Sequence, residues 1–145
     1  MWWGRSARSK AVVARFVAAI NAHDADAVEA MMTEDFTYID SWREGVSGRP
    51  KVIAALRSLI AIDLDFGMEI DEVDWRDPHV LMTGRVNSRQ FGSGRRAVWQ
   101  VLVRDGLVAE YQAWAEGGPP PMSRMLAPSY AQDMSSRATE KPEIG

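Results

Sequence analysis

The spacing of apolar side chains changes at about residue 64, and this change limits the folds open to the chain. Before residue 64, apolar residues recur at the three- and four-residue intervals typical of helices, as in Val12, Val13, Phe16, Val17 and Ile20. After it, apolar and polar residues alternate in segments typical of strands. The sequence therefore predicts an α+β architecture, in which three helices pack on one face of a curved antiparallel sheet.

The helical half contains recognisable helix starts. The first helix is predicted over about 7–21. Asp24 is a suitable N-cap for a short second helix, and Pro50 suits the first turn of a third. One strand, "FTYIDSW" at 36–42, lies between the second and third helices. The segment "REGVSG" that follows it is typical of a turn.

The second half of the domain predicts four strands joined as a meander. "FGMEIDEVDW" alternates imperfectly, which predicts a β-bulge. "FGSGRR" and "RDG" are typical of hairpin connections. From "GGPPP" onward the apolar pattern weakens. We therefore expect a domain over 1–116 and a tail over 117–145 that is extended or partly disordered in isolation, with a few apolar residues able to dock on the body.

The composition narrows the function classes. A chain of 145 residues favours one domain, and 46% hydrophobic with 26% charged residues is ordinary for a globular protein. The net charge of −3 and the lack of a basic block argue against nucleic-acid binding. The apolar run "AVVARFVAAI" is interrupted by Arg15, so we expect an amphipathic helix rather than a signal peptide, and no membrane association. The absence of cysteine excludes disulfides and is compatible with the reducing cytoplasm, where we expect this protein.

The strand "FTYIDSW" places a carboxylate among aromatic rings. Alternation puts four of its side chains on one face: Phe36, Tyr38, Asp40 and Trp42. Burying a charge is costly unless it is paired, protonated or used. Two readings follow: Asp40 is catalytic, or it is structural and accepts hydrogen bonds from backbone amides or pairs with Arg43 or Arg49.

The stretch "VVARFVAAINAHDADAVEAMMTEDFTYIDSWREGVSGRPKVIAAL" resembles the cone-shaped superfamily of nuclear-transport-factor-like proteins, and within it the ketosteroid isomerases and the SnoaL-like polyketide cyclases. The resemblance covers roughly 10–116. It implies a deep apolar pocket between the helices and the concave sheet face, and a homodimer formed through the sheet. This scaffold hosts isomerases, cyclases, dehydratases, epoxide hydrolases and binding domains, so the fold does not fix the function.

The resemblance assigns catalytic roles only in part. Asp40 stands where ketosteroid isomerases keep the aspartate that moves a proton between carbons; their oxyanion hole is a tyrosine and a protonated aspartate. Phe16 and Gln100 stand at those two donor positions. A phenyl ring cannot donate a hydrogen bond, and a glutamine amide is a weak acid. Tyr38 or Tyr111 could supply a replacement phenol.

Other chemistries of the superfamily have less support. The epoxide hydrolases need an Arg-x-Asp strand motif and a final acid, which line up here with Val98–Gln100 and Ala113, all uncharged. An Asp–His acid/base pair would need one of the two histidines, His23 in a turn or His79 at the start of a strand. Four arginines around one hairpin predict a solvated surface, with an anionic-ligand or dimer contact as the alternative: Arg85, Arg89, Arg95 and Arg96.

Two functions are therefore predicted. In the first, an isomerase, cyclase or lyase moves a proton on a small hydrophobic carbonyl substrate. Asp40 is its general base, with Tyr38 and Gln100 assisting, and no cofactor or metal is needed. The substrate would contact Phe16, Trp42, Val98, Tyr111 and Ala113. In the second, the chain is a non-catalytic module for hydrophobic-ligand binding or dimerisation. The expected partners are a small hydrophobic ligand and a second copy of the chain.

Overall fold

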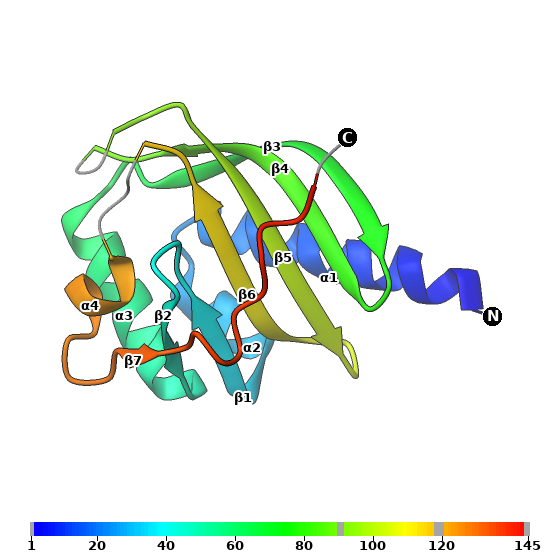
Figure 1. The fold of residues 1–145 in the computed structure, drawn as a ribbon, viewed down its shortest axis with the longest axis horizontal. Helices are drawn as coiled ribbons and strands as arrows, with labels where there is room; N and C mark the ends of the chain where they lie inside the picture. Colours follow the sequence, from blue (N-terminus) through cyan, green and yellow to red (C-terminus); the bar gives the residue numbers. More distant parts are fainter. Residues whose placement is uncertain (1, 90–91, 118–120, 144–145) are drawn as a thin grey trace.

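The computed structural model describes residues 2–89, 92–117 and 121–143 of the protein. Along the chain lie α1 (Trp2–Asn21), α2 (Ala25–Ala30), β1 (Met32–Ile39), β2 (Glu44–Ser47), α3 (Arg49–Ile62), β3 (Gly67–Arg76), β4 (His79–Asn87), β5 (Arg95–Arg104), β6 (Leu107–Ala115), α4 (Met122–Leu126) and β7 (Gln132–Asp133). Figure 1 shows α1, α2 and α3 on one face of a curved sheet and the C-terminal segment crossing the other face. The predicted α+β architecture is confirmed.

The predicted helix starts are confirmed. The Asp24 carboxylate accepts a hydrogen bond from the Ala27 N–H at 3.0 Å and caps α2. Pro50 lies in the first turn of α3, where its missing N–H leaves no bond unmade. His23 fixes the turn between α1 and α2, since its Nε2 lies 2.7 Å from the Phe66 carbonyl oxygen.

The sheet is mixed, with strand order β3-β4-β5-β6-β1-β2-β7. β1 runs parallel to β6, and every other neighbouring pair is antiparallel. The segment predicted as a turn, "REGVSG", contains the short strand β2. The predicted bulge is confirmed between Ile70 and Glu72. Opposite it, a Cβ on Gly84 would lie 1.9 Å from the Glu69 carbonyl oxygen, so this close approach requires glycine.

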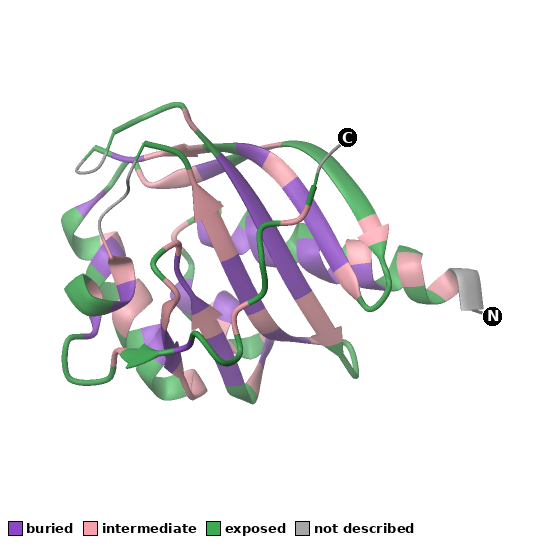
Figure 2. Cartoon of the chain, viewed as in Figure 1, coloured by how far each residue is buried: buried purple, intermediate pink, exposed green. Residues whose placement is uncertain are grey.

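The core lies between the helices and the concave face of the sheet. Figure 2 shows buried residues running across the central strands and along the inner sides of α1 and α3. The side chains that fill it include Val13, Phe16, Phe36, Met82 and Val101, each no more than 2% exposed. No helix among the described residues is long and apolar enough to cross a bilayer.

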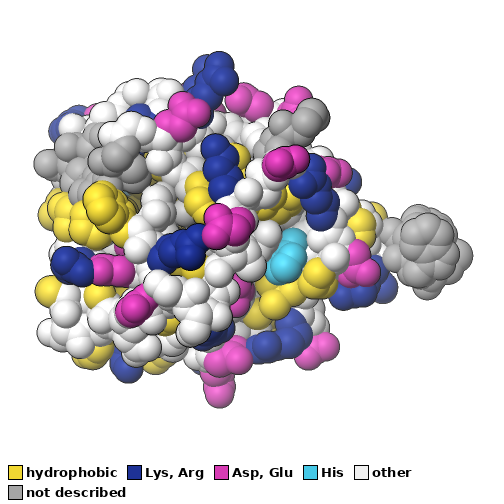
Figure 3. Space-filling view, in the orientation of Figure 1, with side chains coloured by type: hydrophobic (Ala, Val, Ile, Leu, Met, Phe, Trp, Pro, Cys, Tyr) yellow, Lys and Arg dark blue, Asp and Glu magenta, His cyan; other side chains and the backbone are white. Residues whose placement is uncertain are grey.

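The C-terminal segment packs on the body. Residues 118–120, at the predicted start of the tail, lie outside the described residues. Beyond them, α4 lies beside α3, and β7 pairs with β2. Met134 is 3% exposed, and the Thr139 N–H donates to the Gln112 side-chain oxygen at 3.2 Å. The outer sheet face is therefore partly covered by the chain itself, and around that cover Figure 3 shows acidic and basic side chains interspersed.

Replacing Met134 by alanine tests whether this segment stabilises the fold. Because Met134 is buried, Met134→Ala is expected to lower the free energy of unfolding by about 2 kcal/mol, measured by urea denaturation. The matched control is Met125→Ala, which removes a side chain that is 47% exposed and should change stability by less than about 0.5 kcal/mol. Equal effects of the two substitutions would show that the segment is not docked.

Candidate functional site

An apolar cavity of about 160 Å³ lies between the helices and the concave face of the sheet. Its walls come from elements far apart in the sequence and include Phe16 of α1, Val52 and Leu56 of α3, Trp99 of β5 and Leu126 of α4. Met122 and Leu126, four residues apart, share one side of α4 and face the cavity. The short helix α4 therefore covers one side of the cavity.

The structure brings together five of the predicted site residues. These are Phe16, Tyr38, Asp40, Tyr111 and Ala113, all of which line the cavity. Side chains on β1 and β6 alternate between the two faces of the sheet, so Tyr38, Tyr111 and Ala113 share the concave side.

The other three predicted residues lie elsewhere. Trp99 faces the cavity, so its neighbours Val98 and Gln100 face outward, and the Gln100 amide donates to the Thr139 hydroxyl at 3.2 Å. β1 ends at Ile39, before the predicted end of the strand. Trp42 consequently lies in the turn after β1, 56% exposed, and does not line the cavity.

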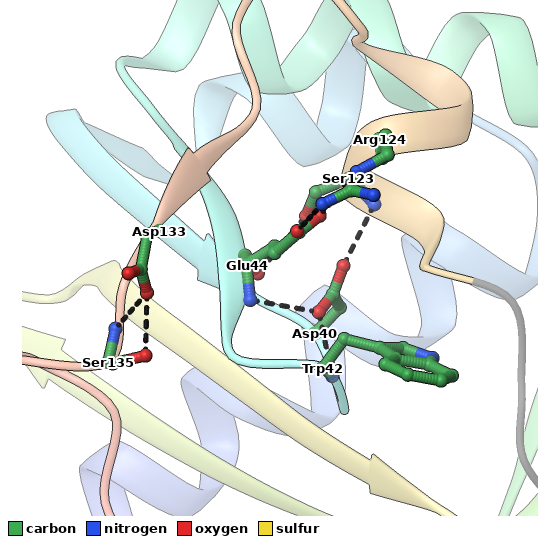
Figure 4. A network of polar contacts seen from close by, with 7 residues as sticks. All are labelled: Asp40, Trp42, Glu44, Ser123, Arg124, Asp133 and Ser135. Carbon is green, nitrogen blue, oxygen red and sulfur yellow. Dashed lines mark hydrogen bonds and ion pairs between the residues drawn. The ribbon is translucent and has the colours of Figure 1, made fainter.

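The Asp40 carboxylate is buried and bound to three backbone amides (Figure 4). Its Oδ1 accepts hydrogen bonds from the N–H of Trp42 at 2.9 Å and of Glu44 at 3.1 Å. Its Oδ2 accepts from the N–H of Ser123 at 3.0 Å, 83 residues further along the chain. One carboxylate thus closes the β1–β2 turn and holds the first turn of α4.

Further contacts fix α4 at the same place. The Ser123 hydroxyl donates to the Glu44 carbonyl oxygen at 3.2 Å, and Arg124 pairs with the Glu44 carboxylate. Neither arginine proposed as a partner of Asp40 binds it: Arg43 pairs with Glu140 at 2.6 Å, and Arg49 donates to a backbone carbonyl. Two structural roles are open to Asp40: accepting hydrogen bonds from backbone amides, or pairing with an arginine. The geometry matches the first.

Two tyrosines lie next to Asp40 on the cavity wall. The Tyr38 and Tyr111 rings are tilted, with centroids 6.0 Å apart, and the Tyr111 hydroxyl donates to the Met68 sulfur at 3.3 Å. Burial, and then the Asp40 charge, raise the pKa of Tyr38 well above its usual value. Burial is also the main cause that raises the pKa of Tyr111. Both phenols are therefore protonated at neutral pH and can donate hydrogen bonds.

Neither histidine reaches the cavity. His23 is held in the α1–α2 turn, and His79 begins β4 at the far end of the hairpin. Partial burial lowers the pKa of His79, and this effect outweighs the nearby negative charges of Glu110 and Asp77, which raise it. Asp40 therefore has no histidine partner for acid–base work. Within the described part of the chain, no cluster of three or more His, Cys, Asp or Glu side chains is arranged to hold a metal ion.

Sequence reasoning missed three features of the site. Arg95 was predicted on a solvated surface but lines the cavity, on the same side of β5 as Ala97 and Trp99. Alternation places Arg95 on the same face of the strand as Trp99, but it does not show which face lines the cavity. The lining residues of α4 lie in the predicted tail. The fully buried Asp63 carboxylate accepts hydrogen bonds from the Arg89 N–H at 3.0 Å and from the Ser88 hydroxyl. These two bonds fix the connection that follows β4.

Comparison with known proteins gives the relationships of the chain. The family model described as "SnoaL-like domain" matches residues 13–111, more than half of the chain. No curated protein sequence matches this chain.

Solved structures share its fold at low sequence identity. An NTF2-like protein of unknown function from Mesorhizobium loti has a TM-score of 0.67 at 19% identity, covering 78% of this chain and 94% of that one. A putative SnoaL-like polyketide cyclase from Shewanella denitrificans has a TM-score of 0.67 at 17% identity, covering 74% and 90%. A hypothetical protein from Catenulispora acidiphila with a ketosteroid isomerase-like fold, in complex with trimethylamine, has a TM-score of 0.63 at 15% identity, covering 71% and 83%.

Asp40→Asn should weaken the link between the β1–β2 turn and α4. An asparagine has one acceptor oxygen, so its NH₂ group would face a backbone N–H that now binds a carboxylate. We expect the free energy of unfolding to fall by about 1 to 3 kcal/mol, measured by chemical denaturation.

The matched control is Asp133→Asn. Asp133 also accepts from a backbone N–H and a hydroxyl, both of Ser135, but it is exposed, so water can replace those bonds (Figure 4). If the two variants lost the same stability, the Asp40 carboxylate would not be a structural anchor.

Proposed function

This chain belongs to the SnoaL-like domain family, and from that premise and the geometry of the site we propose that it binds a small hydrophobic molecule in the cavity. The observation that carries the proposal is the apolar cavity, which α4 covers on one side. Protein interiors are normally packed without voids of this size, so such a space in a small domain favours a binding role.

The size of the cavity indicates the size of the ligand. Its volume of about 160 Å³ is close to that of an engineered apolar cavity of about 150 Å³ that binds benzene. Sites for larger ligands usually measure about 300 to 1,000 Å³. We therefore expect a single-ring or short-chain ligand, and a polycyclic ligand only if α4 moves away from the cavity.

Proton transfer is the second candidate function. It is favoured by the position of Asp40 on the cavity wall beside Tyr38, whose protonated phenol could donate to a substrate carbonyl oxygen. In this reading Asp40 is the general base of an isomerase, cyclase or lyase. Both oxygens of the carboxylate already accept hydrogen bonds from backbone amides that hold it in place, so the geometry supports binding more strongly than base catalysis.

The homodimer implied by the family resemblance stays a prediction. The C-terminal segment lies over part of the outer sheet face, where Gln100 and Gln112 bind Thr139. A dimer formed through this face would therefore use residues of that segment as part of its contact.

Filling the cavity tests the binding proposal. Ala55 of α3 lines the cavity, whereas its neighbour Ala54 is exposed, so phenylalanine at these two positions forms a matched pair. A panel of small hydrophobic ketones, lactones and single-ring compounds is screened by thermal shift, because a ligand that binds only the native state raises its stability.

We expect wild type and Ala54→Phe to be stabilised by the same compounds, and Ala55→Phe to lose at least about tenfold in affinity for them, since the added ring takes up the ligand's volume. Equal affinities for the two variants would place the ligand outside the cavity. The absence of any thermal shift across the panel would contradict the proposal.

Base catalysis makes a separate prediction for Asp40. If a carbonyl compound from the panel is turned over, Asp40→Asn should lower kcat by about 100- to 10,000-fold, the usual contribution of a general base. Calorimetry should show that the variant still binds the compound. Deuterium uptake from D₂O at the carbon next to the carbonyl, followed by NMR, reports the proton transfer directly. A variant in which binding and turnover fall together would show that Asp40 acts only by holding α4.

A further inference from the structure

Most polar groups on the cavity wall already have partners. The Ser41 hydroxyl accepts from the Ala115 N–H at 2.9 Å and donates to the Ala113 carbonyl at 3.3 Å. The Asp40 oxygens are bound to three amides, and the Tyr111 hydroxyl contacts the Met68 sulfur. These groups are satisfied by the protein itself and do not require a ligand.

Two polar groups on the wall are different. Neither the Tyr38 hydroxyl nor the Nε of Arg95 has a hydrogen-bond partner among the described residues, and of the two only the Arg95 Nε is buried. Leaving a buried donor without an acceptor is unfavourable, and more so for a charged guanidinium. In a cavity built for a ligand, such donors mark where its acceptor atoms lie.

Arg95 also differs from Arg85 and Arg89 of the same hairpin, which form ion pairs, and from Arg96, which is exposed on the other face of β5. Arg85 lies within 3.4 Å of Glu69, and Arg89 within 2.9 Å of Asp65. No ion pair is found for Arg95 in the described part of the chain. Arg95 therefore lines a largely apolar space without an ion-pair partner among the described residues.

The strand registers place Arg95 at one end of the cavity. It is the first residue of β5 and pairs with Val86, and two residues later Ala97 pairs with Ala115 at the end of β6. Tyr38 lies further inside, paired with Tyr111 across the β1–β6 junction. A ligand could thus bind with its charged group at Arg95 and its apolar body along the aromatic side chains.

We propose that the ligand is a small hydrophobic carboxylate whose anionic group binds the Arg95 guanidinium. This inference rests on the proposed function and adds the chemical class of the ligand. A guanidinium binds a planar carboxylate through two parallel hydrogen bonds, and such charged bonds strengthen where water is excluded. Asp40 lines the same cavity, but both of its oxygens are already bound to backbone amides.

The test compares acids with their neutral isosteres. Benzoate, phenylacetate and hexanoate are titrated by calorimetry at neutral pH beside benzamide, phenylacetamide and hexanamide. The amides match the acids in shape and lack only the charge. The variants are Arg95→Gln, Arg95→Lys and Arg96→Gln. Arg96 is the neighbouring arginine, exposed on the other face of β5, and serves as the control.

We expect wild type and Arg96→Gln to bind at least one acid about 10- to 100-fold more tightly than its amide. Arg95→Gln should bind acid and amide alike, and Arg95→Lys should retain part of the preference because it keeps the charge without the planar pair of donors.

The remaining outcomes separate the two proposals. If wild type binds acids and amides equally, or if Arg95→Gln keeps the preference, the carboxylate inference fails while the binding function stands. If no acid or amide binds wild type, the carboxylate inference fails. The binding function itself fails only if the neutral panel tested with Ala55→Phe also gives no binding.

Discussion

The buried carboxylate of Asp40 is the contact on which the arrangement of the site depends. Its two oxygens join the turn after β1, the start of β2 and the first turn of α4, which is separated from Asp40 by five strands and one long helix. A helix of five residues is not stable by itself in water. Both its helical conformation and its position must therefore come from tertiary contacts. The Asp40–Ser123 bond and the contacts of Glu44 supply them. Without them the cavity would lose the wall formed by Met122 and Leu126.

Local signals in the sequence were enough to predict the helices and the bulge. Asp24, Pro50 and the broken alternation near Ile70 act through neighbouring atoms, so their effects do not depend on the rest of the fold. The carboxylate among aromatic rings was also visible, although its strand ends earlier than predicted. A turn that Asp40 itself closes by binding the N–H of Trp42 ends the strand and turns the Trp42 side chain outward.

The side of β5 that lines the cavity could not be predicted from the order of apolar and polar residues in the strand, for a physical reason. Consecutive residues 97–101 are all buried, because the helices cover one face of the strand and the C-terminal segment covers part of the other. Alternation between apolar and polar residues therefore vanishes, and nothing local shows that Trp99 rather than Gln100 faces the cavity. The C-terminal segment carries few apolar residues, and its docking depends on partners such as Gln112 far away in the sequence. Long-range contacts of this kind leave no periodic signal.

The cavity itself is a reason to expect that the protein works with a ligand bound. The apolar side chains that line the cavity of about 160 Å³ lack packing partners on the side that faces it, which is unfavourable for the folded state. The buried Nε of Arg95, which has no hydrogen-bond partner among the described residues, adds a further unfavourable contribution at the same place. A hydrophobic carboxylate would offset both, because its apolar body restores the missing packing contacts while its oxygens accept hydrogen bonds from the Arg95 guanidinium, including the Nε–H that has no partner. The two features are independent in origin, one steric and one electrostatic, and a single class of ligand accounts for both.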